Sequence, residues 1–469
     1  MILIAFKTIF SKENKKMIFA ITLIIVVFAL YIFYLKLGVV KLLLHPGFYF
    51  LIIWAFSIAS EWLYYSLGIA IVIDKYYIDE LNIYAAYTSI CFLLCLLMDK
   101  KNRCSLGEVK SFKIFHSYNL FLFLTVLSFI GLVIRFVSMG ASFNMGVNRA
   151  NVFLYNMNST SNFLGSLLGF FNFILLIYSG FLFVSKILKL RTVKFGNFVI
   201  ILPLIFGVLE GVLIGGRNPV IIAIKYFFIG MSFALLGLKT NKQTLVKLYK
   251  FVFVIFVSFA VFSSIVGEQR NQTFGDESRV KKLDNKLLLM TSGISNYLSS
   301  HYWGYQLRRI DYVDENNLLY GAATFYGLLD VKVPFSSRLG INDDLNIWNN
   351  FTSYTPKELY FDLQYEGYYT TNSIYLSLMK DYGKIGMFFV IFIMVFITHR
   401  CFNYVVNYRG RNVSHLFVYL MFFTYWGSSN FDSTMNSNVY MSFLIPLLLY
   451  DVIKKFFKPS YPLFISNKN

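Results

Sequence analysis

Long apolar runs recur along almost the whole chain, separated by short polar loops. A helix that crosses a bilayer needs about 20 mostly apolar residues, because backbone amides in hydrocarbon must bond within their own segment. The run 47–72 contains Glu61 and is long enough for two half-helices, and 83–98 and 385–399 are short unless they extend at one end. In all, the pattern predicts spans at 17–35, 47–72, 83–98, 117–137, 161–184, 197–214, 218–237, 251–267, 385–399, 414–430 and 438–453.

The composition agrees with this pattern and excludes a water-soluble protein. Hydrophobic residues make up 57% of the 469 residues and charged residues only 14%, with a mean hydropathy of +0.59. A soluble protein carries roughly 25% charged residues to cover its surface. We therefore expect an all-α polytopic membrane protein of about 11–12 transmembrane helices.

Basic residues concentrate in alternate loops, and lysines and arginines are retained on the cytoplasmic side of a membrane. The basic loops carry Lys100, Lys101, Arg103, Lys110 and Lys113; Lys186, Lys189, Arg191 and Lys194; Lys239, Lys242, Lys247 and Lys250; Arg400, Arg409 and Arg411; and Lys454, Lys455, Lys458 and Lys468. With eleven spans the lysine-rich N-terminus would lie outside, against this rule. Either a twelfth crossing lies within 36–73, or the first helix inserts against the rule.

One long polar segment, 268–372, falls on the outer side of this topology. Its ten basic and thirteen acidic residues give a net charge of −3, which leaves +22 on the rest of the chain. The overall charge of +19 is therefore a sign of membrane topology, and we expect no nucleic-acid partner. The segment divides the chain into an N-terminal bundle of about eight spans at 1–267, a large extracytoplasmic loop at 268–372 and a C-terminal bundle of about three spans at 373–469.

The outer segment is rich in aromatic and amide side chains, and its stretches 286–300 and 317–329 predict short helices at the membrane surface. Aromatic faces stack on sugar rings, and they also form belts at membrane interfaces. The composition alone leaves both interpretations open. The four cysteines and five histidines have no metal-ligand spacing, and no phosphate-binding loop is present, so we expect neither a metal nor a cofactor.

Four arginines are predicted at the outer boundary of the membrane. Arg135 ends the fourth span, Arg149 follows it and Arg270 follows the eighth. Arg217 lies in the turn Gly215-Gly216-Arg217-Asn218-Pro219, at the start of the seventh span. Guanidinium groups match paired phosphate oxygens, and a helix N-terminus also favours an anion. The arginines either bind a diphosphate or extend to lipid phosphates.

A carboxyl group, Glu210, lies within the sixth span. It precedes Arg217 by seven residues, about two helical turns, which predicts both side chains on one helix face. Glu210 is either a deeper part of the same site or a neutral, hydrogen-bonded carboxyl at a helix interface.

The residues that lead into the ninth span resemble a family signature. Tyr375, Leu376, Asp381, Gly383 and Gly386 match, at the right spacing, the pattern of the bacterial O-antigen polymerase and ligase superfamily. Asn372 stands where the ligases have histidine, so the segment looks more like the Wzy-type repeat-unit polymerases. The Gly-Gly-Arg turn also resembles a turn common in that family. The topology, with one large outer loop in the C-terminal half, is similar to that of the family as well. Without the resemblance, Gly383 and Gly386 are an ordinary helix-packing face, and Asp381 pairs with a neighbouring lysine.

The resemblance implies a GT-C-like membrane glycosyltransferase in the bacterial inner membrane, with its active site facing the periplasm. Its donor and acceptor would be glycans on undecaprenyl diphosphate, and it would polymerise repeat units into O-antigen or capsular polysaccharide. The arginines would hold the diphosphate without a metal. Asp381 would be the first candidate for the general base and Glu210 the second, while Asn372 and Tyr375 would orient oxygens of the substrate.

Membrane lipids surround such a protein, and the resemblance also implies a chain-length regulator and a flippase as partners. Two other functions stay open from the sequence. The first is an O-antigen ligase-like transferase. The second is a lipid-linked oligosaccharide flippase or transporter, although these usually have short outer loops and two related halves.

Overall fold

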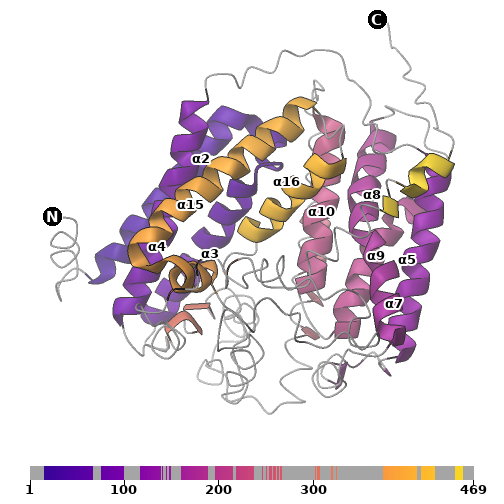
Figure 1. Cartoon of the computed structure of the whole chain (residues 1–469), viewed down its shortest axis with the longest axis horizontal. Coiled ribbons are helices and arrows are strands. Elements are labelled where there is room, and N and C mark those ends of the chain that lie inside the picture. Colours follow the sequence, from indigo (N-terminus) through magenta and orange to yellow (C-terminus); the bar gives the residue numbers. More distant parts are fainter. Residues whose placement is uncertain are drawn as a thin grey trace, which may run out of the picture.

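The structure, a computed structural model, is a bundle of helices (Figure 1). It describes residues 15–66, 75–99, 117–138, 160–188, 196–214, 218–236, 373–408 and 413–427, with short stretches between 140 and 148, 246 and 266, 301 and 324, and 449 and 457. The helices are α2 (Lys15–Leu42), α3 (Pro46–Ser66), α4 (Lys75–Met98), α5 (Tyr118–Ser138), α7 (Thr160–Gly169), α8 (Phe171–Ile187), α9 (Asn197–Ile214), α10 (Asn218–Leu235), α15 (Ile374–Tyr408), α16 (Val413–Gly427) and a 3-10 turn at Lys454–Phe456. Among these residues there is no strand.

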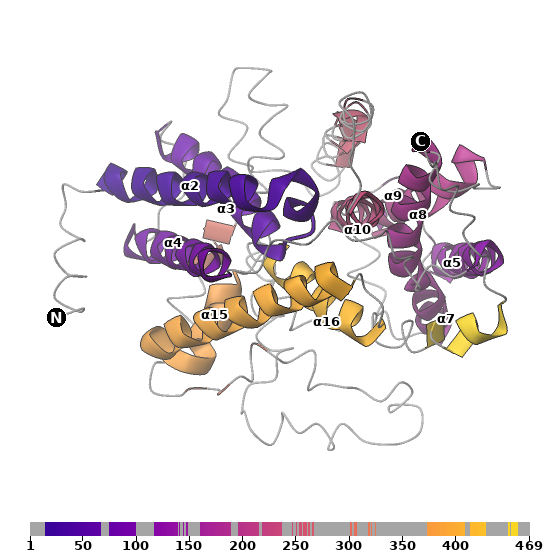
Figure 2. The ribbon, with the colours of Figure 1, turned by 90° about the horizontal axis from the view of Figure 1, so that it is seen from above.

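The helices form two groups that lie side by side (Figures 1 and 2). The first three, α2, α3 and α4, pack against α15 and α16, which come from the other end of the chain. The second group consists of α5, α7, α8, α9 and α10. The C-terminal helices therefore complete a bundle that the N-terminal helices begin.

Six helical stretches are long and apolar enough to cross a bilayer: Ile18–Leu42, Pro46–Ser66, Lys75–Met98, Tyr118–Ser138, Leu167–Ile187 and Ile374–Val406. Asn197–Leu213 and Pro219–Leu235 are shorter apolar helices. Large apolar side chains also face outward, as Ile385, Phe389 and Ile393 do along α15. Such a surface is suited to lipid and would aggregate in water. The expectation of an all-α, multi-pass membrane protein is confirmed.

The predicted spans and the observed helices differ mainly at their ends. The short span 385–399 is the middle of α15, which runs from Ile374 to Tyr408, and α4 begins at Lys75 rather than at residue 83. The run 47–72 is one continuous helix as far as Ser66, with Glu61 inside it. Of the predicted span 251–267, the described residues are 253–255, 257–259, 261–262 and 265–266, and all of them are helical. The predicted span 438–453 and the short helices of the outer segment lie mostly outside the described residues.

Two glycines explain how α8 and α10 come together. A Cβ atom on Gly180 would lie 2.0 Å from the backbone oxygen of Phe227, and one on Gly230 would lie 2.0 Å from that of Ile177. The two backbones are thus in direct contact, which only residues without a side chain permit.

Polar contacts between α10 and α16 join the two groups of helices. The Tyr226 hydroxyl lies 2.5 Å from Thr424 Oγ1, and the buried Lys225 ammonium donates to the backbone oxygen of Gly427. Gly427 is the last residue of α16, where unsatisfied carbonyl groups favour a cation. Lys225 therefore caps α16 from the neighbouring group.

Candidate functional site

The structure describes four of the eight site residues that the sequence singles out. Tyr375 and Asp381 lie in the first turns of α15, Arg135 in the last turn of α5 and Glu210 near the end of α9. Arg149, Arg217, Arg270 and Asn372 lie outside the described residues.

A break in α15 sets the position of Asp381. Gly383 has φ 67° and ψ 177°, a conformation that is essentially restricted to glycine. The helix is therefore interrupted just after Asp381, and the last carbonyl groups before the break lose their partners in the next turn. One of them, the backbone oxygen of Asp381, accepts a hydrogen bond of 3.0 Å from the Tyr320 backbone N–H.

The side chain of Asp381 holds a second point of the outer segment. Its Oδ2 accepts a hydrogen bond of 2.6 Å from the Thr324 backbone N–H, and the side chain is fully buried. A backbone N–H donor stabilises the ionised form of a carboxyl. Asp381 thus fastens the described parts of the outer segment to the start of α15.

Tyr375 lies one and a half turns before Asp381 and points into the same group of helices. Its hydroxyl lies 2.9 Å from Thr88 Oγ1 on α4, and its ring centroid is 5.4 Å from that of Trp54 on α3. The Trp54 centroid also lies 5.0 Å from that of His301. Trp54 therefore joins the start of α15 to the outer segment.

Three buried carboxyl groups lie on the same helices as these aromatic rings and their partners. Glu61 on α3 and Asp79 and Glu80 on α4 are each 1–5% exposed. Glu80 accepts two hydrogen bonds, one of 3.1 Å from the Tyr84 hydroxyl and one of 2.9 Å from the Tyr305 hydroxyl. A charge in such a setting is costly unless it is paired or hydrogen-bonded, and the tyrosines supply donors.

The stretch 301–306 of the outer segment packs against these buried side chains of α3 and α4. Besides the Tyr305 contact, the Tyr302 hydroxyl donates a hydrogen bond of 2.6 Å to Asn82 Oδ1. In Figure 1 the stretch lies at the lower ends of α3 and α4, beside the start of α15. We name the whole set the acid–tyrosine cluster: Trp54, Glu61, Asp79, Glu80, Asn82, Tyr84, Tyr302, Tyr305, Tyr375 and Asp381.

Electrostatics within the cluster keep its tyrosines in the donor form. Burial, followed by the neighbouring Glu61, Tyr375 and Asp79, raises the pKa of Tyr302 well above its ordinary value. A tyrosine hydroxyl is protonated at physiological pH even at its ordinary pKa of about 10, so the shift only makes loss of the proton harder, and the hydroxyl donates a hydrogen bond to Asn82. The Asn82 amide nitrogen is buried and has no hydrogen-bond partner among the described residues.

Most of the cluster is absent from the sequence-based prediction. The predicted spans 47–72 and 83–98 leave Asp79 and Glu80 in the loop between them. The structure places them inside α4, where side chains from more than 200 residues away cover them. The many tyrosines near residue 300 could have indicated that this stretch takes part in the cluster, but the sequence does not identify the partner of each ring.

Arg135 and Glu210 lie in the other group of helices and form an ion pair. Their side chains are 10% and 25% exposed, and they join the end of α5 to the end of α9. Glu210 thus lies at a helix interface, as one alternative predicts, but it is paired with a guanidinium group instead of being a neutral carboxyl. Of the predicted residues that the structure describes, Arg135 and Glu210 are in direct contact, while Tyr375 and Asp381 are both buried in the first turns of α15 and bond to different partners.

One further contact bears on the arginines that lie outside the described residues. The Asn148 side-chain amide donates a hydrogen bond of 2.8 Å to the backbone oxygen of Val212. Asn148 is next to Arg149 in the sequence, and Val212 precedes Arg217 by five residues. The chain neighbours of two predicted anion-binding residues are thus in contact.

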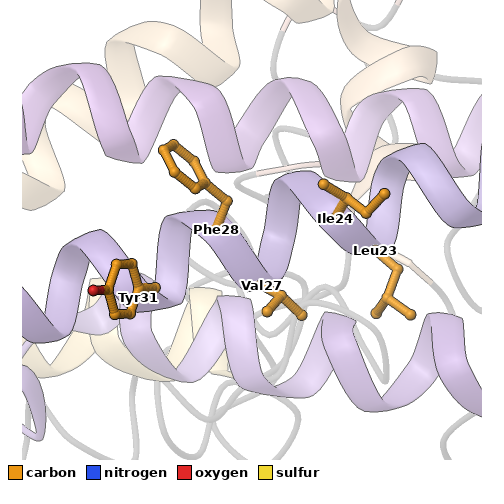
Figure 3. A pocket seen from close by; sticks show the side chains of 5 residues that line it. All are labelled: Leu23, Ile24, Val27, Phe28 and Tyr31. Atoms are coloured by element: carbon orange, nitrogen blue, oxygen red, sulfur yellow. The ribbon is translucent and has the colours of Figure 1, made fainter.

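An apolar groove on α2 has a different character. It is lined by Leu23, Ile24, Val27, Phe28 and Tyr31 (Figure 3). Four of these side chains are more than half exposed, all except Leu23. The groove offers no charged group for sugar or phosphate chemistry, and it belongs to the lipid-facing surface.

Comparison with known proteins assigns no family to the chain. No protein-family model matches it, and neither the curated proteins nor the solved structures contain a significant match. The chain's own residues show a multi-pass helical membrane protein with a buried acid–tyrosine cluster.

Proposed function

We propose that this chain is a membrane glycosyltransferase that polymerises undecaprenyl-diphosphate-linked oligosaccharide repeat units on the outer face of the bacterial inner membrane. The observation that carries the proposal is the position of Asp381. It is buried at a break in α15, six residues after Tyr375, and it holds two points of the outer segment. A site for a membrane-bound glycan needs such a junction between a helical bundle and a polar segment.

The chemistry requires a base for one hydroxyl group. In the proposed reaction, a hydroxyl of the acceptor unit attacks the anomeric carbon of the donor, and the bond to the diphosphate breaks. The hydroxyl proton passes to a carboxylate, for which Asp381 is the first candidate. The Thr324 N–H binds Oδ2 and stabilises the ionised form that a base requires.

The departing diphosphate requires cations. Arg217, Arg149 and Arg270 are proposed to hold it, and the contact between Asn148 and Val212 supports a common location for the first two. Arg135 is engaged by Glu210, so this pair is proposed to fix α5 against α9 beneath the diphosphate. Glu210 remains the second candidate for the base.

Transport of a lipid-linked glycan is the second candidate function. The observation in its favour is the burial of Glu61, Asp79 and Glu80 within helices, since ionisable residues at membrane depth also mark proton and substrate pathways. The two functions differ in where the substrate accumulates when the protein fails.

A surface-glycan ladder from a deletion strain tests the proposal. The strain is complemented with the wild type, Asp381→Asn, Arg217→Ala or Arg217→Lys, and membrane levels are matched by immunoblot. We expect the first two variants to leave one repeat unit on the lipid core, and Lys to rescue poorly because it lacks the guanidinium fork. Accumulation of untranslocated units in the cytoplasmic leaflet would instead establish transport. A normal ladder from Asp381→Asn would remove Asp381 from the reaction.

A further inference from the structure

A second set of polar side chains lies at the opposite end of α4 and α15 from the acid–tyrosine cluster. Asp99 follows the last residue of α4, whose first turns hold Asp79 and Glu80. His399 follows Asp381 by eighteen residues along α15, roughly 27 Å of helix. His45 lies in the turn between α2 and α3.

These three side chains form one continuous chain of hydrogen bonds. The Gly47 backbone N–H donates to His45 Nδ1 at 3.0 Å, and His45 Nε2 lies 3.1 Å from His399 Nδ1. His399 Nε2 lies 3.2 Å from Asp99 Oδ2. Asn403 Nδ2, 3.0 Å from His399 Nε2, also donates to Asp99 Oδ2.

For two neutral imidazoles, the Gly47 contact determines which ring nitrogen carries the hydrogen. A backbone N–H is only a donor, so His45 Nδ1 carries no hydrogen and a neutral His45 carries its hydrogen on Nε2. That hydrogen is donated to His399 Nδ1, which must then be the acceptor. A neutral His399 therefore carries its hydrogen on Nε2 and donates it to Asp99. The chain runs in one direction, from the backbone of the turn to a carboxylate.

The pair of imidazoles is shielded from solvent, whereas Asp99 is accessible. His45 is 0% and His399 4% exposed, but the Asp99 side chain is 20% exposed. Aromatic rings surround His45, with centroid distances of 4.9 Å to Phe33 on α2, 6.0 Å to Phe92 on α4 and 4.4 Å to Phe402 on α15. The charged groups that act on the pair are Asp99 and Arg400. Asp99 is therefore the most solvent-accessible of the three side chains.

We infer that His45, His399 and Asp99 form a proton-binding site that holds the turn between α2 and α3 against α15 and releases it when one proton is bound. The inference is independent of the proposed glycosyltransferase activity.

Proton counting shows why binding releases the turn. An additional hydrogen on His45 Nδ1 faces the Gly47 N–H, which is also a donor. An additional hydrogen on His399 Nδ1 faces the hydrogen on His45 Nε2. If His45 changes tautomer so that its Nε2 accepts the hydrogen of His399 Nδ1, the hydrogen of His45 moves to Nδ1 and faces the Gly47 N–H. Every position for an added proton on the imidazoles therefore breaks one hydrogen bond of the chain.

The direction of the pH response follows from burial. Burial, followed by the charge of His399, lowers the pKa of His45 well below its ordinary value of 6.5. A released, hydrated His45 has the ordinary pKa, so the released state binds more protons in the acid range. The closed turn is thus fully stable above about pH 6.5 and loses stability as the pH falls below it. If one proton is bound, the equilibrium constant between the closed and the released turn changes by up to about tenfold per pH unit.

The Gly47 amide is a direct reporter, because its N–H bonds to His45 Nδ1. Hydrogen exchange of a peptide spanning residues 43–48 is measured on the full chain in lipid nanodiscs, at about pH 7.5 and about pH 5.5, on either side of the ordinary imidazole pKa. After correction for the intrinsic rate, we expect exchange to rise up to roughly tenfold at the lower pH. A peptide spanning residues 177–184, where α8 contacts α10, is the internal control and should not change.

A double variant, His45→Gln with His399→Gln, separates titration from general acid sensitivity. Each glutamine places an acceptor oxygen and a donor nitrogen in the same order but does not titrate. We expect its exchange to be the same at both pH values. An equal rise in the double variant and the wild type would overturn the inference.

A measurement without a variant covers the case in which the double variant does not fold. Nitrogen-15 NMR of histidine-labelled wild type reports which ring nitrogen carries the hydrogen. Two neutral imidazoles protonated on Nε2 at about pH 7.5 are expected. Protonation of His45 on Nδ1 at that pH would contradict the hydrogen-bond order and the site with it.

Discussion

Gly383 in α15 and Gly38 in α2 have almost the same backbone conformation, with φ and ψ of 67° and 177° at the first and 65° and 169° at the second. A Cβ atom would meet only ordinary contacts with Leu318 at Gly383 and no atom within 4 Å at Gly38. Conformation rather than space therefore requires glycine at both positions. Only Gly383 adjoins the acid–tyrosine cluster.

This pair provides a matched test of the break in α15. Gly383→Ala and Gly38→Ala should each lower the free energy of unfolding by about 1–3 kcal/mol, the cost of that conformation for a residue with a Cβ. Only Gly383→Ala should also shorten the surface-glycan ladder, because it alone displaces Asp381. Thermal unfolding in detergent and the ladder assay measure the two effects. Equal ladders from both variants would show that the position of Asp381 does not depend on the break.

The hydrogen bond from Tyr305 to Glu80 should be important for the docking of the outer segment. Tyr305→Phe removes one of the two tyrosine donors to a buried carboxyl and should destabilise the protein by about 1.5–3 kcal/mol, the usual contribution of a hydrogen bond to a charged group. Limited proteolysis should then cleave near residue 300 more rapidly. Tyr320→Phe is the control, since its side chain is 83% exposed. Equal proteolysis of both variants would mean that the stretch is held by other contacts.

The contact between α8 and α10 should not tolerate a methyl group. Gly230→Ala places a Cβ atom 2.0 Å from the Ile177 oxygen and should separate the helices, at a cost of about 1–3 kcal/mol or more. Gly169→Ala, where no atom lies within 4 Å, should be neutral or slightly stabilising. Thermal unfolding of the two variants compares them directly. A neutral Gly230→Ala would show that the backbones are farther apart than the structure indicates.

The Arg135–Glu210 pair is suited to a charge-exchange experiment. Each single variant, Arg135→Glu or Glu210→Arg, should destabilise the protein by about 1–3 kcal/mol, because like charges then face each other in a partly buried site. The double variant should recover most of the stability if the pair joins α5 to α9. Recovery of stability together with loss of the ladder would show that one member also acts on the substrate.

The helices of this protein could be predicted where a span is bounded by polar residues on both sides. The span 197–214 coincides with α9 for this reason. The start of α4 could not be found, because Asp79 and Glu80 resemble loop residues until a tyrosine 225 residues later in the chain covers Glu80. Local sequence does not encode such a long-range contact.

The same limit applies to the candidate site. Asp381 and Tyr375 stand out in the sequence only through the family resemblance, and the structure shows that both are buried. Glu61 was noted only as an interruption of an apolar run. Its significance depends on neighbours from α4 and the outer segment, which the sequence does not place beside it.

The packing of α2, α3 and α4 against α15 and α16 has a consequence for biosynthesis. When α4 leaves the ribosome and enters the membrane, Tyr305 and Tyr302, which donate to Glu80 and Asn82, have not yet been translated. Of its two tyrosine donors, Glu80 then has only Tyr84 of its own helix, and α4 must remain in or near lipid until more than 200 further residues have been translated. During this interval α4 depends on water, an insertase or a membrane chaperone, and truncation before residue 373 would leave the N-terminal helices permanently unassembled.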